Sequence, residues 1–233
     1  MPGPPSELEA LGRRARAAAQ ILAVSSRVSR DYALMSSAEL IASRSVAILA
    51  ANAEDVSRCE EAGASDAAID RLRLSKDRLS SMIGGLRQVA SLPDPVGEVV
   101  EGSRRPNGLS VERVRVPLGV VGIIYENRPN VTADAAALCL KAGNAALLRG
   151  SAAAIESNRA IASALRDGLE AAELPADAVI LIEDVTHEAA QAFVQLRGVI
   201  DCLIPRGGPA LISMILDKAT VPYVIDGDGN CHV

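Results

Sequence analysis

Two Arg-Gly pairs stand where short apolar runs of the sequence end. Arg149-Gly150-Ser151 follows one run and Arg206-Gly207-Gly208 follows another, and each precedes a segment with helical periodicity. The free amides of a helix N-terminus bind phosphate, and a guanidinium binds it with two hydrogen bonds. The pairs therefore predict a site for a phosphorylated cofactor, a phosphorylated substrate, or both. A solvated loop is the alternative for either pair taken alone.

A third polar cluster, Tyr125-Glu126-Asn127-Arg128-Pro129-Asn130, follows another apolar run. Pro129 restricts Arg128 to an extended backbone, from which its side chain can reach a ligand at the end of a strand. Two simpler interpretations stay open. Asn127 and Asn130 are common turn formers, and Arg128 could be a surface residue that pairs with Glu126.

Cysteine and histidine offer little further chemistry. The four cysteines are Cys59, Cys139, Cys202 and Cys231, and the two histidines are His187 and His232. Their spacing fits no zinc motif, and the histidines are too few for a His-based metal site or a Ser-His-Asp triad. We interpret Cys139 and Cys202 as core thiols, Cys59 as a partly exposed helix residue and His187 as a surface residue. Cys231 follows a glycine-rich loop, but only His232 is near enough in sequence to activate it.

The first ninety residues show helical periodicity. Apolar residues recur at helical spacing over residues 6–23, 31–43 and 45–62, and Ser65 and Ser75 are N-cap candidates for two further helices that end before Pro93. Residues 97–103 and 109–116 then alternate apolar and charged side chains around a turn at 104–108, which predicts a β-hairpin. A hairpin is marginal by itself, so we expect it to pack on something else.

From residue 117 the pattern becomes β-α-β. We expect strands at 120–125, 145–148, 178–182, 202–204 and 222–225, and helices at 132–141, 151–172, 186–197 and 208–219. Continuous apolar strands that alternate with helices predict an open, mostly parallel sheet with helices on both faces. The three polar clusters would then meet at the carboxyl ends of its strands, where such sheets bind ligands.

Composition excludes several classes of protein. The chain has 233 residues, of which 49% are hydrophobic and 2% aromatic, so its core must consist of Ala, Val, Leu and Ile. The 24 basic and 29 acidic residues form no long run of one sign, which argues against a nucleic-acid or membrane surface. The N-terminus lacks the features of a signal peptide and no apolar run is of transmembrane length, so we expect a cytoplasmic protein.

Several motifs resemble those of one enzyme family. Residues 116–131 have the sequence VPLGVVGIIYENRPNV, which is similar to the hallmark stretch of γ-glutamyl phosphate reductases. Further similar segments are LCLKAGNA at 138–145, LLRGS at 147–151, IPRGG at 204–208 and GNCHV at 229–233, with AANAED at 50–55, LRL at 72–74 and DPVG at 94–97 near the front. The resemblance covers nearly the whole chain.

The resemblance implies a fold and a reaction. The family is a branch of the aldehyde dehydrogenase superfamily, with a nucleotide-binding domain, a catalytic domain and an oligomerisation hairpin. It implies that residues 1–96 are the helical part of the nucleotide-binding domain, 97–116 the hairpin and 117–233 the parallel NADP-binding part. The family reduces γ-glutamyl phosphate with NADPH to glutamate-5-semialdehyde and phosphate in proline biosynthesis, through a cysteine thioester, and a homo-oligomer is expected.

Roles are transferred only at matching positions. Arg149 and Ser151 match positions that meet the adenosine ribose, where an Arg suits the 2′-phosphate of NADP. Arg206, Gly207 and Gly208 match a helix start near the cofactor pyrophosphate. Arg128 and Asn130 lie in the loop that faces the substrate, and Asn127 matches an asparagine of the superfamily's oxyanion hole, although this family usually has a small residue there.

Some positions depart from the family pattern. Pro209 and Asp226 stand where other residues are usual, and Pro209 removes one amide from the expected phosphate site. The family's nucleophilic cysteine motif and catalytic domain are not in this sequence, so we expect the chain alone to be inactive. It is then the cofactor-binding half of the reductase, or else a truncated, non-catalytic module that binds NADP or pairs with subunits. A parallel α/β phosphate binder outside the family is the third interpretation.

Overall fold

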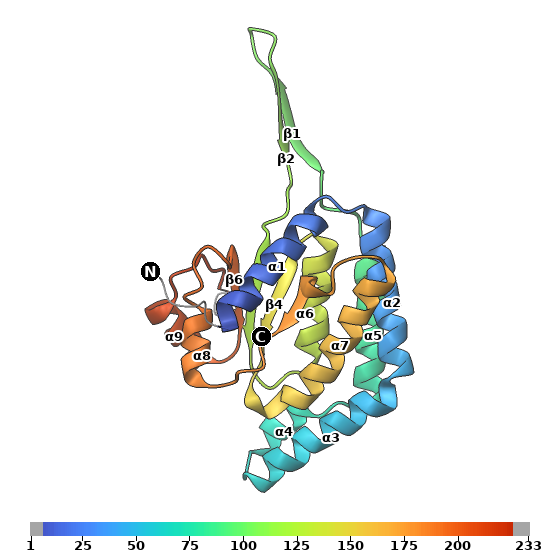
Figure 1. Ribbon diagram of the computed structural model, residues 1–233, viewed down its shortest axis with the longest axis vertical. Coiled ribbons are helices and arrows are strands. Elements are labelled where there is room, and N and C mark those ends of the chain that lie inside the picture. Colours follow the sequence, from blue (N-terminus) through green and yellow to red (C-terminus); the bar gives the residue numbers. More distant parts are fainter. Residues whose placement is uncertain (1–6, 226–233) are drawn as a thin grey trace, which may run out of the picture.

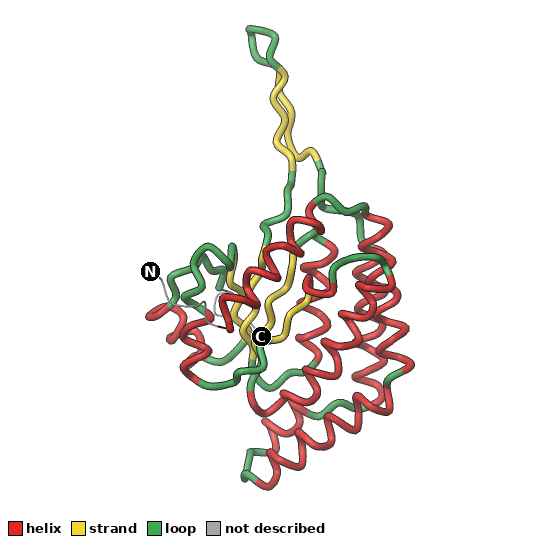
Figure 2. Tube along the Cα trace, viewed as in Figure 1, coloured by secondary structure: helices red, strands yellow, loops and turns green. Residues whose placement is uncertain are grey.

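The computed structural model describes residues 7–225, which form helices around a small parallel sheet and one projecting hairpin (Figures 1 and 2). The α-helices are α1 Glu7–Ala23, α2 Arg27–Ser43, α3 Ser45–Glu61, α4 Asp66–Leu72, α5 Lys76–Ser91, α6 Asn130–Lys141, α7 Ile155–Ala171, α8 His187–Phe193 and α9 Pro209–Lys218. The strands are β1 Val99–Arg104, β2 Ser110–Val114, β3 Val120–Tyr125, β4 Ala145–Arg149, β5 Val179–Leu181 and β6 Cys202–Arg206.

Serine hydroxyls cap α2, α4 and α5. Ser65 accepts a hydrogen bond from the backbone N–H of Ala68 at the start of α4, and Ser75 accepts one from Arg78 at the start of α5. Both caps were predicted from the sequence and are confirmed. Ser26 caps α2 in the same way, so that this helix begins four residues before the periodic apolar pattern suggested.

Strands β3, β4, β5 and β6 form one parallel sheet, in the order β5-β4-β3-β6. Strands β4 and β5 extend to one side of β3, whereas β6 pairs with its other side, so the strand order reverses at β3. Ligand crevices of open parallel sheets lie at such a reversal, beyond the carboxyl ends of the strands. By this rule, a ligand of this sheet would bind between the ends of β3 and β6.

Helices cover both faces of the sheet, as the sequence predicted. Val121 and Ile123 of β3 pack in a core with residues of α2, α5, α6 and α7. Val120 and Ile124 point the other way and pack with residues of α1, α8 and α9. Because all six residues of β3 are buried, the strand is apolar on both faces, which is why it shows no alternation in the sequence.

The hairpin of β1 and β2 extends away from the body, on the side opposite α3 and α4 (Figure 1). Its strands pair antiparallel, with Glu101 opposite Arg113, and every residue of both strands is exposed. The hairpin itself is confirmed. The packing that we expected for it is not provided by the described part of this chain.

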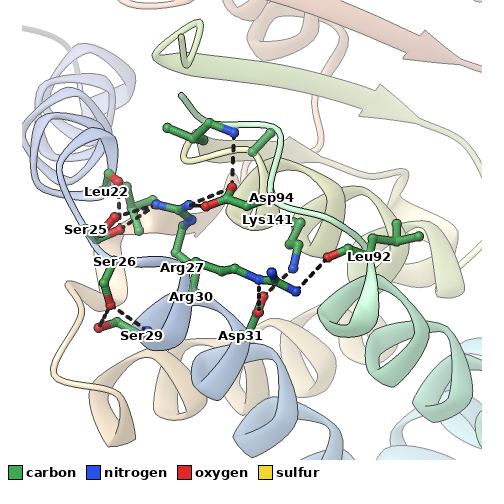
Figure 3. A network of polar contacts seen from close by, with 12 residues as sticks. Leu22, Ser25, Ser26, Arg27, Ser29, Arg30, Asp31, Leu92, Asp94 and Lys141 are labelled. Atoms are coloured by element: carbon green, nitrogen blue, oxygen red, sulfur yellow. Dashed lines mark hydrogen bonds and ion pairs between the residues drawn. The ribbon is translucent and has the colours of Figure 1, made fainter. Parts of the chain in front are cut away.

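A buried polar network anchors the base of the hairpin to the body (Figure 3). The guanidinium of Arg30, only 2% exposed, binds both carboxylate oxygens of Asp94 at 2.9 and 2.7 Å. Asp94 also accepts a hydrogen bond from the backbone N–H of Val96. Lys141 of α6 binds Asp31 of α2 at 2.5 Å. Such buried charges are tolerated only as pairs, so the network fixes the path of the chain into β1.

The segment 222–225, the last that the structure describes, differs most from the sequence prediction. A strand was expected at 222–225, but only one β-bridge forms there, between Tyr223 and Leu203. Leu203 donates to the carbonyl of Pro222 at 2.8 Å and accepts from the backbone N–H of Val224 at 3.0 Å, but within residues 7–225 no second residue pair extends this bridge, and Tyr223 and Val224 are exposed. The predicted helix 186–197 is shortened to α8, and the predicted helix at 151 begins with a 3₁₀ turn, Ala152–Ala154, before α7.

No single helix within residues 7–225 has the length and apolar composition needed to cross a membrane. Helices α2 and α3 reach that measure only when they are taken together, and they are bent by 70° at the break between them.

Candidate functional site

The three polar clusters predicted from the sequence meet at one edge of the sheet. In the parallel register, Arg149 lies beside Ile124 and Arg206 lies beside Tyr125. The backbone N–H of Glu126 donates to the carbonyl of Arg206 at 3.2 Å. The ends of β3, β4 and β6 are therefore neighbours, and the residues that follow them lie at the edge of the sheet where the strand order reverses.

Asn127 and Ser151 contact each other directly across two loops. The Ser151 hydroxyl donates to the side-chain oxygen of Asn127 at 2.7 Å. This bond orients the Asn127 amide, whose nitrogen makes no hydrogen bond with residues 7–225. A fixed amide N–H at a strand end can donate to an oxygen on which negative charge develops.

Arg149 is held by the loop that precedes α8. Its Nη2 donates to the carbonyl oxygens of Val185 and Thr186 at 2.7 and 2.8 Å, and its Nε is buried with no hydrogen-bond partner within residues 7–225. Burial lowers the pKa of the Arg149 guanidinium from its ordinary value, and the nearby Asp184 carboxylate opposes this effect. An arginine stays protonated under such a shift, so the strand end carries an immobilised cation.

Two glycines allow close packing where β6 leads into α9. A Cβ on Gly207 would lie 2.8 Å from the carboxyl carbon of Glu126 and 2.6 Å from Cδ2 of Leu211. Gly208 is the N-cap of α9 without a side-chain cap, and Pro209 follows in the first turn, where proline is tolerated. The α9 N-terminus is therefore open to an anion, although the Glu126 carboxylate lies beside it.

Arg128 and Asn130 line a cleft to which Asn127 and Ser151 do not contribute. They share this cleft of about 410 Å³ with residues of α4 and α5. The Asn130 amide donates to Asp134 at 2.9 Å, and burial raises the pKa of the Asp134 carboxyl, an effect that this hydrogen bond opposes. Within residues 7–225 the Arg128 side chain forms no ion pair, so the alternative pairing with Glu126 is not observed.

A buried polar chain beneath these loops was not predicted. The Tyr125 hydroxyl lies 2.7 Å from that of Thr132, which donates to the side-chain oxygen of Asn158 at 2.9 Å, and all three residues are buried. A Cβ on Gly150 would lie 2.2 Å from Nδ2 of Asn158, so only glycine fits there. The one available signal was polar residues on otherwise apolar faces of α6 and α7. This chain of contacts supports the loops from below.

Two of the three described cysteines are poor nucleophiles. Burial raises the pKa of Cys139 to about 12 and also raises that of Cys202. Cys59 has only a long contact of 3.9 Å from its sulfur to the Ala153 carbonyl, and His187 is exposed at the start of α8. Cys231, His232 and Asp226 lie outside the described residues. Within residues 7–225 no group of three His, Cys, Asp or Glu residues could hold a metal ion.

Comparison with known proteins places the chain in a family. Residues 4–222 match the aldehyde dehydrogenase family. The chain is 48% identical over 228 residues to the γ-glutamyl phosphate reductase of a Geobacillus species, covering 98% of this chain and 55% of the relative. The crystal structure of the Thermotoga maritima γ-glutamyl phosphate reductase matches with a TM-score of 0.94 and 41% identity, covering 97% of this chain and 55% of that one.

A more distant solved structure agrees. The Saccharomyces cerevisiae γ-glutamyl phosphate reductase matches with a TM-score of 0.89 and 32% identity, covering 96% of this chain and 57% of that one. This chain thus spans about half the length of the relatives that it matches. The resemblance inferred from the motifs and the aldehyde-dehydrogenase-like α/β fold are both confirmed, and the chain belongs to the aldehyde dehydrogenase family.

Proposed function

We propose that this chain is the NADP-binding half of a γ-glutamyl phosphate reductase that acts in the cytoplasm in proline biosynthesis. The relatives that it resembles at 48% and 41% identity carry that name. The observation that carries the proposal is the meeting of the three polar loops at the carboxyl edge of the sheet, where Arg149 and Arg206 lie on the two sides of β3. The reaction converts γ-glutamyl phosphate and NADPH to glutamate-5-semialdehyde, phosphate and NADP.

The residues at this edge fit a phosphorylated dinucleotide. Among the described residues, the Nε of Arg149 is buried without a partner, and α9 begins without a side-chain cap. Arg149 and Ser151 would hold the ribose with its 2′-phosphate, while Arg206, Gly207 and Gly208 would hold the pyrophosphate. Because the Glu126 carboxylate lies beside Gly207, we expect it to turn away when pyrophosphate binds. NADPH, when bound, supplies the hydride for the reduction.

The substrate roles fall to the loop after β3. Arg128 has no ion pair within residues 7–225, so its guanidinium can bind the acyl phosphate, with Asn130 beside it in the same cleft. The amide of Asn127, oriented by Ser151, would donate to the substrate's carbonyl oxygen as it gains negative charge. These groups bind and orient the substrate, but none of them is a nucleophile.

The covalent step needs a thiolate from elsewhere. Burial raises the pKa of both Cys139 and Cys202, so neither forms a thiolate readily. We therefore expect the nucleophile to come from a segment equivalent to the unmatched half of the relatives, and the 233-residue chain alone to be inactive.

The hairpin favours assembly into a homo-oligomer. All residues of β1 and β2 are exposed, although a two-stranded hairpin is only marginally stable alone. Its free strand edges can add to the sheet of another subunit. This feature also suits the second candidate function, a non-catalytic module that binds NADP or pairs with full-length subunits.

Activity and native mass separate these two candidates. We expect the isolated chain to form no NADPH from glutamate-5-semialdehyde, phosphate and NADP. A native protein close to the length of the relatives, with phosphate-dependent activity, supports the reductase, whereas a native mass near 24.2 kDa supports the module. In the active protein, Arg128→Met should reduce phosphate-dependent turnover while NADPH affinity stays unchanged. Turnover by the isolated chain that is lost in Cys231→Ala would contradict the proposal.

A further inference from the structure

The cleft that contains Arg128 carries an excess of positive charge. It is lined by four arginines and two aspartates: Asp70, Arg71, Arg73, Arg78, Arg128 and Asp134. Arg128 and Asp134 come from the β3–α6 region, and the other four come from α4, its C-cap residue Arg73 and the start of α5. Clustered guanidiniums attract anions, and the two carboxylates give the same cleft a place for a cation.

Two of the four arginines have no partner among the described residues. Arg78 binds both carboxylate oxygens of Asp70, at 3.0 and 3.1 Å, and Arg73 binds Glu60 at 2.9 Å. Within residues 7–225, Arg71 and Arg128 form no ion pair or side-chain hydrogen bond. The cleft therefore has two uncommitted guanidiniums, one on each of its two contributing segments, which suits a ligand with two anionic groups.

The arginine-bearing segment is fixed from below by a buried residue. Asn52 of α3 donates to the carbonyl of Leu72 at 2.9 Å and accepts from the backbone N–H of Leu74 at 2.6 Å. Asn52 also donates to the Ser157 hydroxyl at 3.1 Å, and Ser157 donates in turn to Asp55 at 2.6 Å. Because the backbone on both sides of Arg73 is held in this way, α4 presents Arg71 at a defined place.

We propose that this cleft binds the 2-amino-acid end of the substrate, with Arg71 on the α-carboxylate and Asp134 on the α-ammonium. This inference rests on the proposed function, because γ-glutamyl phosphate carries a carboxylate and an ammonium at one end and an acyl phosphate at the other. Arg128 then faces the acyl phosphate. Burial raises the pKa of Asp134, and an ammonium beside its carboxylate would compensate for the lost hydration.

Calorimetric titration of the 233-residue chain tests the assignment with three probes. These are a non-hydrolysable phosphonate analogue of γ-glutamyl phosphate, the same analogue without its α-carboxylate, and the analogue without its α-amino group. Arg71→Met should weaken binding of the complete analogue about tenfold or more, as expected for a lost charge-assisted hydrogen bond, and leave binding of the descarboxy analogue unchanged. Asp134→Asn should weaken binding of the complete analogue and leave binding of the analogue without its α-amino group unchanged.

Arg87→Met is the matched control, because Arg87 is an exposed arginine of α5 that does not line the cleft. It should bind all three probes as the wild type does. Equal affinities of wild type and Arg71→Met for the complete analogue, or equal losses for the complete and descarboxy analogues, overturn the cleft assignment and leave the reductase proposal standing. If the wild type binds NADPH but none of the probes, the cleft assignment fails. If it binds neither NADPH nor the probes, the proposed function fails as well.

Discussion

The side-chain oxygen of Asn52 lies 2.6 Å from the backbone nitrogen of Leu74. This bond, with the donation from Asn52 to the carbonyl of Leu72, joins two sequence motifs that lie some twenty residues apart, AANAED at 50–55 and LRL at 72–74. Asn52 is 2% exposed, so its polar groups have no access to water. The two motifs therefore act as one unit, a buried amide that shapes the arginine-rich wall of the cleft.

Asn52→Ala should lower the free energy of unfolding by about 1–3 kcal/mol, because it leaves the N–H of Leu74 and the carbonyl of Leu72 buried and unpaired. Urea denaturation followed by circular dichroism measures the change. Glu54→Ala on the same helix, at an exposed position, is the control and should stay within about 0.5 kcal/mol of the wild type. Equal stabilities of the two variants would show that Asn52 is not a structural anchor.

Gly168 marks a close approach of α7 to α2. A Cβ at this position would lie 2.2 Å from the Ser37 hydroxyl and 2.7 Å from the Ser37 backbone nitrogen. Since backbone cannot yield as a flexible side chain does, Gly168→Ala should destabilise the protein by about 1–3 kcal/mol. Gly84→Ala in α5, where nothing lies within 4 Å, should instead stabilise it by up to about 1 kcal/mol. Thermal melts of both variants check this, and stabilisation by both would contradict the packing described.

Asp177 connects α1 to α7 through two arginines. Arg14 binds its two carboxylate oxygens at 2.9 and 2.7 Å, and Arg166 binds it at 3.1 Å. The hydrogen bonds from Arg14 are the main cause of a lowered pKa for Asp177. A lowered pKa in the folded state means that the stabilisation is present above the unfolded-state value of about 3.9 and is lost as pH falls below it.

Asp177→Asn should therefore destabilise the protein by about 1 kcal/mol at neutral pH, since Arg14 is half exposed and solvent screens the pair. The difference in free energy of unfolding between Asp177→Asn and the wild type should shrink as pH falls below about 4. Denaturant midpoints measured at several pH values test this, with Glu39→Gln as a control variant that removes an exposed carboxylate elsewhere. A difference for Asp177→Asn that stays constant down to pH 3 would contradict the account.

Much of the fold followed from local patterns in the sequence. The strand at Val120–Tyr125 was predicted with its observed bounds, because a fully buried parallel strand is an unbroken apolar run. The caps Ser65 and Ser75 were also predictable, because an N-cap residue bonds a backbone N–H only three residues further along the chain. The strand predicted at 222–225 was too long, because its pairing depends on the neighbouring strand, which the local sequence pattern does not show.

The site was predicted less completely. The meeting of the Arg149 and Arg206 loops followed from the rule that parallel strands end at one edge. The bond from Ser151 to Asn127, and the contribution of Arg71 to the cleft around Arg128, depend on how loops and helices far apart in sequence pack together. The buried chain of Tyr125, Thr132 and Asn158 was missed because isolated polar residues in apolar helices do not reveal their partners.

The most direct test of the account is a titration of NADPH and NADH into the wild-type chain and Arg149→Ala, followed by calorimetry. An arginine beside the 2′-phosphate contributes charge-assisted hydrogen bonds of about 1.5–3 kcal/mol, or roughly ten- to hundredfold in affinity. We predict that the wild type binds NADPH more tightly than NADH, and that Arg149→Ala loses this preference while its NADH affinity hardly changes. Failure of the folded wild type to bind either cofactor, or an equal loss of both in Arg149→Ala, would contradict the central claim that Arg149 and its neighbours form an NADP site.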